Sequence, residues 1–296
     1  MRISSESLSY AALAYADIFE YPLTLREWRL FSLFISRPPV KKLAGVEKRI
    51  VNATTYYFLR GREKIINTRL SRTHFALSKW KKAAIVARAL GRIPTVHLVG
   101  VTGGLAMNNA KQDDDIDLYC VTEKNTLWMT RFLVTIFVSL LGVRRTPKAK
   151  DVTDMFCLNM FTTVDGMSIP VGERDLFSAH EVVQMVPLWE RKGTYRKFIL
   201  HNRWVKNYLP TAWRKCQAQN VACGEKINVR ILTLLEPVAR ILQLWYMKKR
   251  HTSEVLGDKI LRFHPKDARV WIKKKLQKRL AKYDISLDSV FIHQLE

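Results

Sequence analysis

The chain has 296 residues, of which 48% are hydrophobic and 10% aromatic. It is long enough for one to three domains and apolar enough to bury a core, which excludes an intrinsically disordered protein. Lysine and arginine number 50 against 26 aspartates and glutamates, so the formal net charge is +24. This excess favours a polyanionic partner, such as a nucleic acid, a nucleotide phosphate or an acidic membrane surface.

The four cysteines form no CxxC pair, so the sequence predicts neither a disulfide framework nor a zinc site. We expect a cytoplasmic protein with reduced thiols, and place Cys120 and Cys157 in the core because both lie in apolar strand-like segments. The longest apolar run, residues 127–143, contains Arg131 and is shorter than the roughly 20 apolar residues that a membrane span needs. It is therefore expected to form a buried helix, and no transmembrane segment is predicted.

Residues 1–68 are expected to form a first domain that begins with two helices. Apolar side chains keep helical spacing through residues 5–34, and Pro22 separates the two helical segments. Thr24 followed by Glu27 is the pattern of a capping box, in which each side chain accepts a hydrogen bond from the other residue's backbone. The second helix is therefore expected to begin directly after Thr24.

A third helix is predicted at residues 40–52, followed by strands at 55–59 and 64–66 around a glycine turn. Three helices and a hairpin are the order of a winged helix-turn-helix domain, and Arg60 and Arg62 would then lie on the wing. Such arginines meet nucleic-acid phosphates in domains of this kind, so RNA or DNA is an expected partner. The alternative is a small helical packing domain with a hairpin lid.

From residue 69 to residue 170 helical and strand-like segments alternate, which is the order of an α/β domain. This region is expected to be the second domain. Its predicted segments are a basic helix at 69–90, a strand at 96–99, a helix at 105–110, a strand at 115–122, a helix at 126–142 and a strand at 155–162.

Residues 171–296 are predicted to form a basic, mostly helical third region, with helices near 174–186, 193–208, 225–249 and 267–283. The last helix carries an apolar stripe that includes Ile272, Leu276 and Leu280, and its other faces are rich in lysine. Those lysines form either a solvated surface or a surface for a polyanion.

Four carboxylates stand within residues 113–117 of this otherwise basic chain. Two unit charges about 5 Å apart repel by roughly 3 kcal/mol at an effective dielectric near 20, so a positive group is expected nearby. Because side chains alternate along a strand, Asp115 and Asp117 share one face while Ile116 and Leu118 point into the core. Two adjacent carboxylates suit Mg²⁺ when a phosphate supplies further oxygen ligands.

Gly103 and Gly104 end a predicted strand and open a helix, where backbone N–H groups can approach a phosphate closely. Together with the acidic strand, this pattern resembles the nucleotidyltransferase superfamily typified by DNA polymerase beta. Its signature is an apolar residue, two glycines or Gly-Ser, a spacer of about ten residues, and Asp-apolar-Asp-apolar. The matching residues here are 101–106 and 115–118.

The resemblance implies a polymerase-beta-like fold and a Mg²⁺-dependent transfer of a nucleotidyl group from a nucleoside triphosphate to a hydroxyl acceptor. Asp115 and Asp117 would hold Mg²⁺, while Gly103, Gly104 and Asn108 would bind the nucleotide. The whole chain also resembles uncharacterised bacterial and archaeal nucleotidyltransferase-like proteins, which place a winged-helix segment similar to residues 15–24 before the catalytic-type domain.

The chain departs from the family at the third carboxylate, which the resemblance places on a later strand. Asn159 occupies that position here, and an amide can orient a group or bind a metal but cannot act as a base near neutral pH. Asp154 is the alternative candidate. The predicted activity is nucleotidyl transfer with Asp115, Asp117 and Asn159 in the catalytic site. The alternatives are a catalytically silent nucleic-acid-binding or regulatory protein, and a protein that binds acidic membranes through its basic C-terminal helix.

Overall fold

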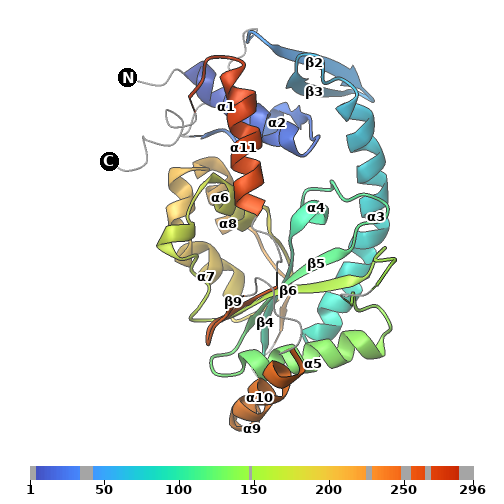
Figure 1. The fold of residues 1–296 in the computed structure, drawn as a ribbon, viewed down its shortest axis with the longest axis vertical. Coiled ribbons are helices and arrows are strands. Elements are labelled where there is room, and N and C mark those ends of the chain that lie inside the picture. The colour runs from blue at the N-terminus through green and yellow to red at the C-terminus, as the bar shows by residue number, and fades with distance from the viewer. Residues whose placement is uncertain are drawn as a thin grey trace.

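A computed structural model describes residues 5–33, 43–146, 149–224, 229–247, 255–263 and 268–286 of the chain. A large mixed sheet lies at the centre of the molecule with helices on both sides (Figure 1). A small sheet and two helices, built from the N-terminal residues, lie at one end. The chain is therefore a mixed α/β protein, as its sequence predicts.

The large sheet has the strand order β8–β7–β4–β5–β6–β10–β9. β5 is parallel to β6 and β7 is parallel to β8, whereas all other neighbours in this sheet are antiparallel. β7 to β10 lie after residue 170, so the sheet continues into the region predicted to be mostly helical. The strands are β4 (Val96–Val101), β5 (Ile116–Thr122), β6 (Phe156–Thr163), β7 (Val186–Arg191), β8 (Cys223–Gly224), β9 (Val255–Leu256) and β10 (Ile260–Arg262).

The side chains of the central strands alternate between two hydrophobic clusters, one on each face of the sheet. Tyr119 and Val121 pack on the side of α1, α6, α7, α8 and α11, whereas Leu118 and Cys120 pack on the side of α3, α5 and α10. The helices on the first side are α1 (Ser5–Ile18), α6 (Leu176–Gln184), α7 (Thr194–His201), α8 (Pro210–Gln217) and α11 (Ala268–Ala281). Those on the second are α3 (Ile65–Leu90), α5 (Leu127–Leu140) and α10 (Glu236–Met247).

The apolar run at 127–143 forms α5, which packs between β6 and α10. Leu127, Val134 and Val138 on this helix are fully buried, so the prediction of a buried helix is confirmed. Among the described helices, none has both the length and the apolar character needed to cross a membrane.

The N-terminal unit contains α1, α2 (Leu25–Leu30) and a sheet of order β1–β3–β2, with β1 at Leu23–Thr24. The capping box before α2 is present, because Thr24 Oγ1 accepts a hydrogen bond from the Glu27 N–H and the Glu27 carboxylate accepts one from the Thr24 N–H. The capping box is thus confirmed.

The third helix predicted at residues 40–52 is wrong over the described part of that range. Val46–Val51 forms β2, which pairs antiparallel with β3 (Thr54–Leu59), and residues 40–42 lie outside the described ranges. The turn between them is made by Asn52 and Ala53, both at positive φ, and not by Gly61. The strand predicted at 64–66 is also wrong, since α3 begins at Ile65. The backbone bonds to β3 outweigh the helical tendency of the charged residues in β2.

Buried Asp17 connects three parts of the chain that are distant in sequence. Its carboxylate accepts hydrogen bonds from Arg62 Nε at 2.7 Å and from Arg279 Nε at 2.6 Å. Arg62 follows β3 and Arg279 lies on α11, so this cluster holds α11 beside α1, as Figure 1 shows. The predicted apolar stripe of α11 is buried at Ile272 and Leu276.

We predict that Asp17→Ala lowers the free energy of unfolding by about 2 kcal/mol, because two guanidinium groups lose their buried counter-ion. Chemical denaturation followed by circular dichroism measures this loss. Asp258→Ala is the matched control, since Asp258 pairs with Arg240 in an exposed position, where a salt bridge contributes less than about 1 kcal/mol. Equal losses in the two variants would contradict a structural role for the Asp17 cluster.

Candidate functional site

The two predicted metal ligands lie side by side at the start of β5. Ile116 and Leu118 are fully buried, so the alternation predicted for this strand is confirmed and Asp115 and Asp117 share the opposite face. β5 pairs with β6 so that Asp117 lies opposite Cys157. One carboxylate oxygen from each aspartate and the Cys157 sulfur lie within 4.8 Å of one another. This cluster is the acidic centre of the site.

Asn159 lies in the same cluster, as its position in the sequence predicts. It is buried, its Nδ2 donates a hydrogen bond to Asp117 Oδ1, and its Oδ1 accepts one from the Cys157 thiol. Asn159 therefore orients the Asp117 carboxylate. The prediction that Cys157 is a simple core residue is wrong, because its side chain is only partly buried and belongs to this polar network.

The positive group expected beside the carboxylates is Arg145. Its Nη1 lies 2.6 Å from Asp115 Oδ2, and its backbone N–H donates to the Phe156 carbonyl at 2.9 Å. Arg145 thus reaches Asp115 from the connection that follows α5. The guanidinium compensates one charge of the pair.

Burial and, to a smaller extent, the neighbouring charge of Asp115 together raise the pKa of Asp117 to about 7, against the opposing effect of the Asn159 amide. Burial and the two aspartates also raise the pKa of the Cys157 thiol to about 12. Without a metal ion the thiol is therefore neutral at physiological pH, and it acts as a hydrogen-bond donor to Asn159.

The glycine turn adjoins this acidic centre. β4 ends at Val101 and the short helix α4 covers Gly103–Ala106. Gly103 has a φ of 66°, and a Cβ on it would lie 2.5 Å from Asp117 Oδ2. A Cβ on Gly104 would make ordinary contacts with residues 109–110, and Gly104 does not have a positive φ. Gly103 is therefore the position that requires glycine.

Asn108 is held by α3 and not by the cavity that the glycines line. Its Oδ1 accepts a hydrogen bond from Trp80 Nε1 at 2.6 Å. Asn109 lines the cavity instead, and donates from its Nδ2 to the Phe19 carbonyl at 2.9 Å. The structure thus brings Gly103 and Gly104 together with the site and leaves Asn108 at its periphery.

A cavity of about 140 Å³ lies among α1, α4 and α6, and Gly103 and Gly104 form part of its wall. Most of the wall is aromatic or aliphatic, including Tyr15, Phe19 and Met107. The Tyr15 and His180 rings stack with their centroids 4.0 Å apart, and burial lowers the pKa of His180 to about 3. His180 is therefore a neutral part of the wall.

Glu181 is the carboxylate of this cavity. Its side chain is exposed to solvent and lies on the cavity wall. Desolvation by the surrounding protein and, to a smaller extent, the charge of Asp117 together raise its pKa to about 7. Glu181 thus acts electrostatically on the acidic centre, although it comes from α6, on a different part of the chain.

The loop before β5 is fixed by Lys79, which is only 1% exposed. Its ammonium group donates to the Gln112 carbonyl at 3.0 Å, to the Asp114 carbonyl at 2.5 Å and to the Asp154 carboxylate at 2.7 Å. Lys82 contacts the other Asp154 oxygen at 2.5 Å. The two lysines outweigh partial burial and lower the pKa of Asp154. Asp154 is therefore a structural counter-ion outside the acidic centre, and not the third carboxylate.

The two arginines predicted to contact nucleic acid lie far along the chain from this centre, in the N-terminal unit. Arg62 pairs with Asp17 at 2.7 Å, so its guanidinium has a structural partner. Arg60 is exposed and lies 3.7 Å from a carboxylate oxygen of Glu47. Nucleic-acid contact by this pair stays a prediction, and Arg60 is the more accessible of the two.

No protein-family model, no curated protein and no solved structure matches the chain.

Sequence reasoning missed Cys157, Arg145, Lys79 and Glu181. Cys157 carried a usable signal, because it stands two residues before Asn159 and so lies on the same face of β6. Glu181 carried none, since its position depends on how α6 packs against the sheet. Arg145 and Lys79 were two among many basic residues, and only the folded chain distinguishes them.

Gly103→Ala and Gly142→Ala form a matched pair, because both glycines have a φ near +70° and a Cβ on Gly142 would meet nothing within 4 Å. We expect each variant to lose about 1 kcal/mol of stability from the backbone conformation. Gly103→Ala should lose more, because its Cβ displaces the Asp117 carboxylate. Thermal denaturation measures the difference, and equal losses would show that the contact with Asp117 is unimportant.

Asp117→Asn tests the raised pKa of Asp117. In the parent protein the Asp117 carboxyl binds its proton more tightly in the folded state than in the unfolded state. Its contribution to the free energy of unfolding is therefore present below about pH 4 and is lost as pH rises through about 7. The variant should therefore be more stable than the parent by on the order of 2 kcal/mol at about pH 8, and by much less at about pH 4. Urea titrations with a chelator present measure the free energy of unfolding, and Asp113→Asn is the control. A difference between Asp117→Asn and the parent that did not grow with pH would contradict the raised pKa of Asp117.

Proposed function

We propose that the chain binds a nucleoside triphosphate with Mg²⁺ and transfers its nucleotidyl group to a hydroxyl acceptor. The observation that carries this proposal is the close approach of Gly103 to Asp117, which puts a glycine turn able to accept phosphates directly beside the paired carboxylates. The antiparallel pairing of β4 with β5 and the parallel pairing of β5 with β6 also support a polymerase-beta-like arrangement.

The donor set suits Mg²⁺ better than a thiophilic metal. Asp115 and Asp117 offer two hard carboxylate oxygens against a single sulfur, and the Cys157 thiol is already hydrogen-bonded to Asn159. Mg²⁺ prefers oxygen ligands and is commonly held by one or two carboxylates together with substrate phosphates. When bound, the ion would neutralise charge on the phosphates during transfer. Arg145, beside Asp115, adds a cation at the same place.

The acceptor hydroxyl needs a group that takes its proton, and Asn159 cannot do so. Glu181 is the candidate base, because it lines the cavity beside Gly103 and has a pKa near 7, which suits proton transfer at neutral pH. In this scheme the hydroxyl oxygen bonds to the α-phosphorus, its proton moves to Glu181, and pyrophosphate leaves. The aromatic wall formed by Tyr15 and Phe19 favours an acceptor with an apolar or planar part.

A second function is favoured by the amide at Asn159. A site without a carboxylate on β6 can bind a nucleotide without turnover, so a silent regulatory or nucleic-acid-binding protein is the alternative. The charge of +24 supports RNA or DNA as a partner in either case. A winged helix remains a weaker part of the proposal, because residues 46–51 form a strand.

Nucleotide binding tests the proposal first. We expect the parent to bind each nucleoside triphosphate more tightly with Mg²⁺ than with a chelator, and the double variant Asp115→Asn, Asp117→Asn to lose at least about tenfold in affinity with Mg²⁺, because its metal ligands are gone. Calorimetry measures both, and Asp113→Asn is the control on the same acidic segment. Unchanged Mg²⁺-dependent binding in the double variant would refute the metal assignment.

A turnover assay then distinguishes a nucleotidyl-transferring enzyme from a protein that binds the nucleotide without catalysis. The parent is incubated with labelled triphosphates, Mg²⁺ and co-purifying RNA, protein and small molecules, and labelled product and pyrophosphate are measured. Glu181→Gln should keep nucleotide binding and lose about 10²-fold or more in transfer rate, which is the usual contribution of a general base. Binding without any transfer by the parent would favour the silent alternative.

A further inference from the structure

Helices α9 (Arg230–Leu234) and α10 carry an apolar stripe that faces solvent. Amphipathic helices of globular proteins normally turn such a stripe toward the core. Here the inner face of α10 carries Ala239, Gln243 and Met247, which are buried. The outer stripe recurs at helical spacing and includes the exposed side chains of Ile231, Leu234, Val238, Ile241, Leu242 and Trp245.

The orientation of this stripe is fixed by polar contacts with α5. The Glu236 carboxylate accepts hydrogen bonds from the backbone N–H groups of Trp128 and Met129, each at 2.8 Å. Gln243 Nε2 donates to the Trp128 carbonyl at 2.7 Å. These bonds satisfy polar groups at the beginning of α5, and hold the stripe on the outer side of α10.

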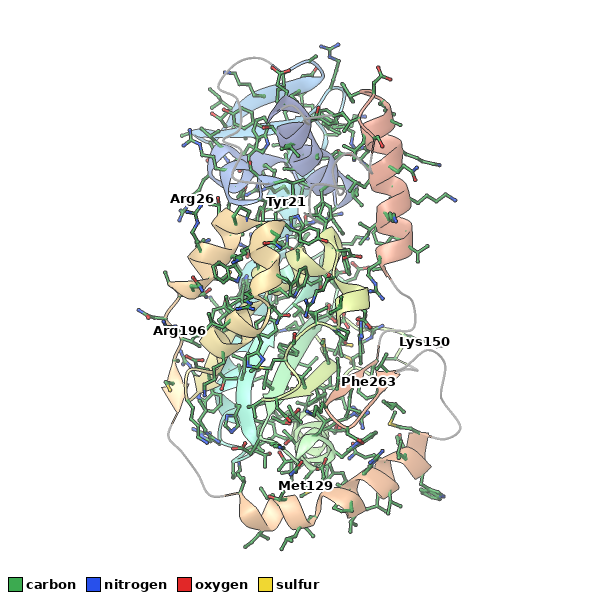
Figure 2. The ribbon with its side chains drawn as sticks, turned by 90° about the vertical axis from the view of Figure 1, so that its left-hand side faces the viewer. Tyr21, Arg26, Met129, Lys150, Arg196 and Phe263 are labelled. Atoms are coloured by element: carbon green, nitrogen blue, oxygen red, sulfur yellow. The ribbon has the colours of Figure 1, made fainter. Side chains whose placement is uncertain are left out.

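Helices α9 and α10 lie at one end of the elongated molecule, opposite the hairpin of β2 and β3 (Figure 1). In Figure 2, α9 and α10 lie across that end, beneath the labelled Met129 of α5, and their side chains extend away from the body. This end of the molecule therefore presents the apolar stripe of α9 and α10, with both helices lying across the long axis. A surface of this kind can bind to a flat partner.

The sequence of this segment carries an excess of positive charge. Glu236 is the one acidic residue in the sequence from 229 to 250, and it is directed toward α5. Arg230 and Arg240 belong to the same segment, and Lys248, Lys249 and Arg250 follow α10 directly in the sequence. Arg240 lies 3.0 Å from the exposed carboxylate of Asp258. The segment thus combines an apolar face that ends in Trp245 with an excess of cations.

We propose that α9 and α10 bind the surface of an anionic lipid bilayer, with the apolar stripe in the interfacial region and the helix axes in the membrane plane. An apolar face with tryptophan and basic flanks is the pattern of interfacial helices, and cations near the bilayer add electrostatic attraction to anionic lipids. A symmetric contact between two copies would bring the same basic flanks together, which disfavours that occupant. The proposal does not depend on the nucleotidyl-transfer activity.

The basic helix α11, considered from the sequence as a membrane-binding element, is less suited to this role. Its apolar stripe at Ile272, Leu276 and Leu280 is buried, and Arg279 is paired with Asp17. Its exposed apolar side chains are confined to Val270 and Trp271 near its beginning, whereas those of α9 and α10 recur along both helices.

Co-sedimentation of the full chain with vesicles tests the proposal, using phosphatidylcholine alone and phosphatidylcholine mixed with phosphatidylserine. Ile241→Glu is compared with Ile85→Glu, because the two isoleucines are 67% and 68% exposed and Ile85 lies on α3, away from the stripe. We expect the parent and Ile85→Glu to bind the mixed vesicles alike, and Ile241→Glu to lose about tenfold or more in partitioning. Brominated lipid should quench fluorescence in the parent more than in Trp245→Phe.

Three results would overturn the proposal, provided that circular dichroism shows all variants folded. The first is no binding of the parent to mixed vesicles at low salt. The second is an equal loss in Ile241→Glu and Ile85→Glu, which would mean that net charge alone drives binding. The third is a dimer in light scattering that Ile241→Glu converts to a monomer without affecting vesicle binding, which would assign the stripe to a second copy of the chain.

Discussion

The candidate site depends on one close contact, between the backbone of Gly103 and the carboxylate of Asp117. A side chain at residue 103 would occupy the space that Asp117 uses, since its Cβ would lie 2.5 Å from the carboxylate. The positive φ of Gly103 turns the chain from β4 into α4 at this point. The glycine turn and the acidic strand therefore form a single structure, and the proposed function would bring a phosphate and a metal ion together there.

Charge compensation keeps this acidic segment in place within a basic protein. Arg145 neutralises Asp115, and Lys79 binds the backbone carbonyls of the preceding loop together with Asp154. A lysine as buried as Lys79 is stable only when its ammonium group is fully hydrogen-bonded, and two loop carbonyls together with Asp154 supply the acceptors. Among the described residues no cation is paired directly with Asp117, and burial together with the charge of Asp115 outweighs the effect of Arg145 and raises its pKa.

The parts of the fold that follow from local periodicity could be predicted from the sequence. Alternation in β5 correctly placed Asp115 and Asp117 opposite Ile116, because the side-chain direction in a strand depends only on position. The helix predicted over β2 failed because pairing with β3 decides its conformation. β8 and β9 are two residues long and have no periodic pattern to detect. Residues that reach the site through packing, such as Glu181, could not be predicted.

The most direct test of the account is a crystal structure of the protein grown with Mn²⁺ and a non-hydrolysable nucleoside triphosphate. Mn²⁺ takes the same oxygen ligands as Mg²⁺ and is visible by anomalous scattering. We predict an anomalous peak in contact with the carboxylates of Asp115 and Asp117, and phosphates against the backbone N–H groups of the turn at Gly103. A nucleotide bound elsewhere, with Arg145 still paired to Asp115 and no metal between the aspartates, would contradict the account.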